Sequence, residues 1–291
     1  MTIAQLLPMF ISTSIMLTVF GLGVNSDVED SIFLFRNPGL FFRSILSMNI
    51  ILVGVAVAIV SMLNLSPAIK IAIVALAMSP VPPVLPRKQH KVGSTGSYAM
   101  GLVVTAALCS IVIVPTWLEL LGRHFQFDVH LGLRKILSIV IESILTPLFA
   151  GILMRRLAPK FAKRLGKPLS ILAAVLLAAG VLPILFTARH ALWAMLGSGV
   201  VLVLAIFSLI GLAVGHLLGG PDPDNRSVLA MATSARHPGI ALAIASLNFP
   251  AQKSAVMIVV LYHLIVGAIV VIPYAKWRSR LHTEPAMGDQ Q

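Results

Sequence analysis

Two residues that hydrocarbon tolerates poorly lie in the middle of an otherwise apolar segment near the end of the chain. The segment spans residues 227–247, and its centre, residues 234–239, reads SARHPG. The guanidinium of Arg236 can bind a carboxylate or sulfonate through two parallel hydrogen bonds, and the imidazole of His237 can carry a proton near neutral pH. The proline and glycine that follow interrupt a helix. This combination predicts an anion site. The alternatives are a structural ion pair for Arg236 and a purely structural hydrogen bond for His237.

Glu142 is the only acidic residue well inside an apolar segment. It is spaced by four residues from both Ser138 and Thr146, so on a helix the three side chains share one face. We expect this polar stripe to face a cavity, because contact with lipid would be costly. Glu142 then either pairs with Arg236 or binds a proton.

The composition of the chain indicates an integral membrane protein. Of 291 residues, 58% are hydrophobic and only 11% are charged, whereas soluble domains carry about 25% charged residues. The net charge of +12 does not point to nucleic acid, because the basic residues collect between apolar runs instead of alternating with aromatics. Such residues anchor loops at the surface of a lipid bilayer, which is the partner we expect.

The apolar segments predict nine transmembrane helices. A helix that crosses the hydrocarbon core needs about 20 mainly apolar residues. That rule selects segments near residues 3–24, 44–63, 66–86, 97–121, 131–154, 168–187, 191–218, 225–247 and 254–275.

The lysines and arginines between these segments predict the orientation. Fifteen lie on one face of the membrane, mostly within residues 36–43, 87–91, 155–167 and 276–280, and five lie on the other. Cytoplasmic loops carry the excess of positive charge. We therefore expect an N-terminus outside and a cytoplasmic C-terminus, in a bacterial inner membrane.

The two halves of the chain predict inverted-topology repeats in a single transporter domain, residues 1–291. Repeat one covers about residues 3–122, a linking helix about 131–154, and repeat two about 165–277. The third helix of each half is interrupted, by SPVPPVLPRKQ from residue 79 and by SARHPG from residue 234. Paired broken helices at corresponding positions of inverted repeats indicate a transporter's binding site near the bilayer midplane. We expect these two breaks to cross.

With these features the chain resembles the bile acid:sodium symporter superfamily, in particular its nine-helix members. Ser79 and Pro80 match the start of the family's first break, and residues 232–245 take the place of the second. His263 and Gly267 match the last helix. The resemblance implies an all-α transporter fold and sodium as the coupling ion, whereas the small organic anion expected as substrate follows from Arg236 and the half-helix ends.

The sequence departs from the family at the positions that bind sodium. Leu85 and Pro86 stand where the family has a Ser-Asn pair. Thr233 stands where the family has an acidic residue, and His237 and Pro238 replace a Gln-Asn pair. Sodium is a hard cation that prefers oxygen ligands, so the residues present favour a proton as the alternative coupling ion. We assign substrate binding to Arg236, His237, Gly239, Ser234 and Pro83. We assign the coupling ion to Glu142, His237, Thr233, Ser79, Thr105 and His263.

These residues predict a secondary active transporter of a small organic anion that works by alternating access, with sodium or a proton as the coupling ion. No HExxH, GxSxG or paired-aspartate motif occurs, so we expect neither an enzyme nor a resident cofactor or metal. The alternative from another class is a membrane sensor or structural subunit that keeps the transporter fold without transporting.

Overall fold

The computed structural model describes residues 3–82, 96–125 and 133–283, and every regular element within those ranges is a helix. The predicted all-α class is thereby confirmed. Pro83, one of the predicted substrate-binding residues, lies outside the described residues, as do Leu85 and Pro86.

The longer helices, which carry most of the apolar sequence, are α1 (Ile3–Val24), α4 (Leu52–Met62), α5 (Pro67–Met78), α7 (Gly96–Phe125), α9 (Thr146–Leu157), α10 (Pro159–Thr187), α12 (Val200–Leu218), α13 (Pro223–Ser234), α14 (Pro238–Asn248) and α15 (Lys253–Thr283). Shorter pieces connect or extend them: α2 (Val28–Arg36), α3 (Pro38–Ile45), α8 (Leu133–Val140), α11 (Arg189–Met195), the π-helical turns η1 (Leu46–Ile51) and η3 (Ile141–Leu145), and the 3₁₀ turns η4 (Leu196–Ser198) and η5 (Pro250–Gln252).

Six helical stretches of the described residues are long and apolar enough to cross a membrane. They cover residues 38–62, 96–125, 159–187, 200–218, 223–248 and 250–281. A seventh is obtained if residues 9–24 and 28–36, which meet at an angle of 87°, count as one bent span. The chain is thus an integral membrane protein, while the count of nine stays a prediction.

Two predicted boundaries differ from the structure. The segment expected as one helix over 191–218 is divided in two: its first residues belong to α11, which ends at Met195, and α12 starts at Val200. Between them lie the short turn η4 and Gly199, which adopts a left-handed conformation with φ of 76°. The segment between the first two spans is helical where we expected a loop. There, Asp27 and Asp30 form a capping box that starts α2.

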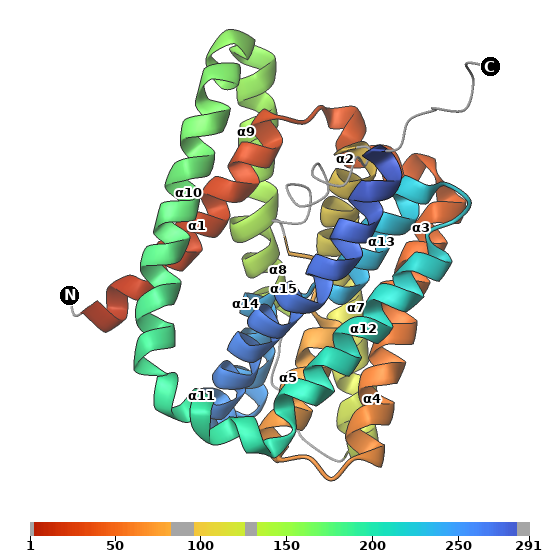
Figure 1. The fold of residues 1–291 in the computed structure, drawn as a ribbon. Helices are drawn as coiled ribbons and strands as arrows, with labels where there is room; N and C mark the ends of the chain where they lie inside the picture. The colour runs from red at the N-terminus through yellow and green to blue at the C-terminus, as the bar shows by residue number, and fades with distance from the viewer. Residues whose placement is uncertain (1–2, 83–95, 126–132, 284–291) are drawn as a thin grey trace.

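The helices form two groups. α1, α9 and α10 pack against one another. In the second group, α5 contacts α4, α14 and α15, and α12 contacts α4, α13 and α15. Figure 1 shows α1, α9 and α10 side by side at the left, α4, α12 and α13 at the right, and α5, α14 and α15 towards the lower centre. Helix α2 packs along α7, and α7 contacts α5 and α13 of the second group.

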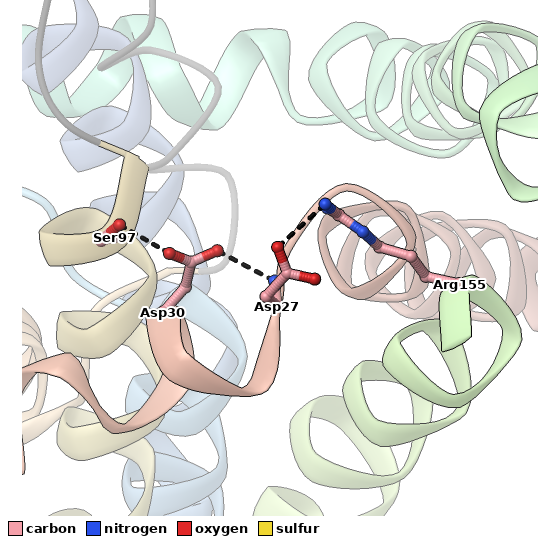
Figure 2. A network of polar contacts seen from close by, with 4 residues as sticks. All are labelled: Asp27, Asp30, Ser97 and Arg155. Atoms are coloured by element: carbon pink, nitrogen blue, oxygen red, sulfur yellow. Dashed lines mark hydrogen bonds and ion pairs between the residues drawn. The ribbon is translucent and has the colours of Figure 1, made fainter. Parts of the chain in front are cut away.

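A polar network joins the two groups at one end of the molecule. Arg155, in the last turn of α9, donates to Asp27 at 2.9 Å, and Asp27 precedes α2. Asp30 accepts from the backbone N–H of Asp27 and from the hydroxyl of Ser97 in α7 (Figure 2). The Arg155–Asp27 ion pair is solvent-exposed, and pairs of this kind contribute only about 0.2–1 kcal/mol. This ion pair can therefore open at little cost.

Glycines set the close packing of α1 on α9. A Cβ atom on Gly151 would lie 2.3 Å from the carbonyl oxygen of Phe20, and one on Gly23 would lie 2.2 Å from that of Leu148. Real Cβ atoms do not approach backbone this closely, so both positions require glycine. Small residues at helix interfaces allow membrane helices to pack backbone to backbone.

We expect Gly151→Ala to force α1 away from α9 and to lower the stability of the protein by about 1–3 kcal/mol, the usual cost of overpacking. Thermal melting of the purified protein in detergent measures this loss. Gly54→Ala is the matched control, because a Cβ at Gly54 has open space around it. Equal melting temperatures for the two variants would show that the packing of α1 on α9 is looser than described.

Candidate functional site

The two predicted breaks meet in the interior of the second helix group. Helix α5 ends at Met78, and α13 ends at Ser234; in each case the next residue is extended and the chain leaves the helix. The backbone N–H of His237 then donates to the carbonyl of Pro80 at 2.9 Å. This hydrogen bond confirms that the two breaks contact each other, although 157 residues separate them in the chain.

The proline at position 238 explains where α14 begins. Proline has a fixed φ that suits the first turn of a helix, where its missing N–H costs no hydrogen bond. His237 caps this helix, because its Nδ1 accepts from the backbone N–H of Ile240 at 3.3 Å. The local sequence therefore stops one half-helix at Ser234 and starts another at Pro238, which leaves Arg236 in the connection between them.

Arg236 is the largest fully buried side chain at the breaks, with 2% of its surface exposed. Its Nη1 donates to the carbonyl oxygen of Ser79 at 3.2 Å, and its Nη2 donates to that of Met48 at 2.7 Å. Its Nε has no hydrogen-bond partner within the described part of the chain. The guanidinium thus joins the second break to the end of α5 and to the π-helical turn η1.

Two buried histidines belong to this interior. His237 is 3% exposed, and its Nε2 has no partner among the described residues. His263, in α15, is also 3% exposed; its ring meets the ring of Phe207 edge to face, and its Nδ1 has no described partner. Each ring therefore keeps one buried nitrogen available to a ligand or a proton.

The hydroxyl groups near the breaks are mostly engaged within the protein. Thr233 shares a hydrogen bond of 2.7 Å with Ser47 of η1. Ser79 donates to Leu76, and Ser234 donates to Met231. These contacts hold the ends of α5 and α13 and tie α13 to the π-helical turn.

Three other predicted residues lie in different surroundings. Thr105 is buried in α7, and its hydroxyl has no described partner. Gly239 is exposed in the first turn of α14, where a Cβ would lie 3.2 Å from the ring of His237. Glu142 is exposed in η3.

The expected alternative of a Glu142–Arg236 ion pair is wrong. Among the described residues, Arg236 takes part in no ion pair, and its terminal nitrogens donate to backbone carbonyls. The buried charge is therefore balanced by carbonyl dipoles and not by a carboxylate. Thr146 is exposed like Glu142, so this part of the polar stripe lies on the outside of its helix.

Sequence reasoning missed the contribution of η1. Ser47 and Met48 lie in a π-helical turn, a feature that is rare and often occurs at functional sites. The only signal in the sequence is the polar pair Ser47 and Asn49 within an apolar segment. The role of Met48 rests on its backbone carbonyl, which no side-chain pattern reveals.

Comparison with known proteins now identifies the class. The model of the Sodium Bile acid symporter family matches residues 13–195, which is more than half of the chain and includes the first break. The protein belongs to this family, whose members are transporters and not enzymes. No curated protein matches the chain. The match ends before α12, so the second break with Arg236 lies beyond it.

We expect the hydrogen bond between Ser47 and Thr233 to couple η1 to α13 energetically. Ser47→Ala and Thr233→Val should each lower the melting temperature, and the double variant should lose less than the sum of the two. Hydrogen bonds between membrane helices contribute about 0.6 kcal/mol on average in such cycles. Additive losses would contradict the coupling.

Proposed function

We propose that this protein is a secondary transporter that moves a small organic anion across the membrane by alternating access around the two crossed breaks. The observation that carries the proposal is the direct joining of the breaks, through the His237–Pro80 hydrogen bond and the buried Arg236. Irregular backbone persists inside a membrane only where protein, water or a ligand satisfies it. In secondary transporters such broken helices form the substrate site.

The charge at the breaks supports an anion as the substrate. Arg236 brings a positive charge that no described carboxylate neutralises. The N-terminus of α14, with His237 and Gly239, adds the positive end of a helix dipole. A guanidinium is suited to carboxylate or sulfonate groups, and the family's name refers to a carboxylic acid. We assign Arg236, His237, Gly239 and Ser234 to this site, together with Pro83 from outside the described residues.

The proposed movement is a displacement of one helix group against the other. The groups are separable because α1, α9 and α10 pack mainly on one another. The exposed Arg155–Asp27 pair joins them weakly at one end. The proposal keeps nine spans, arranged as two inverted repeats that α8 and α9 link. It places the ends of α9 and α15 on the cytoplasmic side of a bacterial inner membrane. The basic residues at those ends, among them Arg155, Lys276 and Arg280, support this orientation.

A proton is the second candidate for the coupling ion, besides the sodium that the family name suggests. The observation that favours it is the unpartnered ring nitrogen in each of the buried residues His237 and His263. Sodium would use oxygen atoms of Ser79, Thr105 and Thr233, whereas a proton would use the two histidines or Glu142. Uptake driven by an imposed pH gradient in sodium-free vesicles distinguishes these candidates.

Counterflow in proteoliposomes tests the transport function itself. Vesicles loaded with an unlabelled mixture of small carboxylates and sulfonates are diluted into a trace of each labelled anion, once in sodium-containing and once in sodium-free buffer. A carrier accumulates its labelled substrate transiently. A sensor or structural subunit accumulates none of them, and that result would overturn the proposal.

Arg236→Ala should reduce this counterflow at subsaturating substrate by roughly 10- to 100-fold, because hydrogen bonds to charged groups contribute about 1.5–3 kcal/mol. Arg189→Ala is the matched control, since Arg189 is exposed and stacks only on Phe186. Equal counterflow activity of the two variants would show that Arg236 does not bind the substrate.

A further inference from the structure

We infer that the guanidinium of Arg236 is a cation built into the chain at the crossing of the breaks, so that the carrier works without a sodium ion at this position. The inference rests on the proposed function for its meaning in transport. The structural part of the inference, an arginine cation bound to backbone oxygens, rests only on the hydrogen bonds of Arg236.

The oxygens around Arg236 form the kind of ligand set that alkali cations use. Ser79 is the C-cap residue of α5, and the carbonyls at the end of a helix have no N–H partner further along it. They also carry the negative end of the helix dipole. Met48 supplies a second carbonyl from the π-helical turn η1. Carbonyl oxygens are typical ligands of hard cations.

The guanidinium of Arg236 forms hydrogen bonds with these oxygens in place of a bound ion. Its two terminal nitrogens donate to the carbonyls of Ser79 and Met48, at 3.2 and 2.7 Å. The side chain is 2% exposed, so the charge has left water for the protein interior. A buried charge requires compensation. With no ion pair to Arg236 among the described residues, the carbonyl dipoles supply it.

A second cation at the same oxygens would meet the fixed charge at close range. Like charges a few ångströms apart repel strongly in a protein interior. The tethered guanidinium also cannot dissociate into either compartment, so it cannot convert a sodium gradient into work. The chain therefore supplies a permanent cation at the junction of α5, α13 and η1, where an exchangeable ion would otherwise have to bind.

Removing the guanidinium should expose a cation site. We expect Arg236→Gln and Arg236→Ala to melt at a lower temperature than the wild type in choline chloride. Replacement of choline by sodium at equal ionic strength should raise their melting temperatures by several degrees, because a ligand that binds only the folded state stabilises it. The wild type should show no difference between sodium and choline.

Arg278→Ala is the matched control. Arg278 is also a buried arginine, 5% exposed, and it donates to the carbonyl of Pro223 and to Ser227, far from the breaks. Its loss should lower the melting temperature without creating a response to sodium. Arg236→Lys keeps a positive charge and should remain insensitive to sodium.

Sodium-specific stabilisation of the wild type would overturn the inference, and this measurement needs no variant to fold. Variants at Arg236 that fold but respond to neither sodium nor lithium would overturn it as well. These experiments use protein in detergent and no substrate. If counterflow fails but sodium raises the melting temperature of Arg236→Gln, the proposed transport function is wrong and the inference about the Arg236 cation still holds.

Discussion

The arrangement of the interior depends on the burial of one charge. Arg236 lies in the connection between α13 and α14, where it contacts the end of α5 and the turn η1. A guanidinium out of water must have its charge balanced and its N–H groups bonded. Two backbone carbonyls, those of Ser79 and Met48, meet this demand for the two terminal nitrogens of Arg236. The breaks and the arginine thus require each other: without the breaks the charge is unsupported, and without the charge the carbonyls lack a donor.

This mutual requirement explains how irregular backbone survives within the apolar interior. The Pro80 carbonyl accepts from His237, and the Ser79 carbonyl accepts from Arg236, so both freed groups are bonded across the crossing. The contact between the breaks is consequently held by these hydrogen bonds. By contrast, the Arg155–Asp27 pair between the two helix groups is exposed and weak. The ion pair between the groups is therefore weaker than the buried bonds at the breaks, which fits the proposed movement of one group against the other.

The sequence predicted the membrane class, the family and the contact between the breaks, because apolar segment length and proline positions are direct physical signals. It also predicted that Arg236 and His237 lie buried at that contact. It did not predict that Arg236 donates to Met48, since a carbonyl's availability depends on the π-helical turn and not on the side chain. Glu142 was the reasonable partner by charge, yet it lies exposed on η3. The start of α12 after Gly199 was missed because most residues of the preceding stretch 191–196 are also apolar, so the apolar pattern alone does not mark the end of α11.

A density map of the protein in lipid, recorded at high sodium concentration, tests the central claim most directly. The account predicts continuous density from the Arg236 guanidinium to the carbonyls of Ser79 and Met48, with no separate ion bound to those oxygens. A guanidinium withdrawn from the carbonyls, with a sodium ion bound to them in its place, would contradict the account.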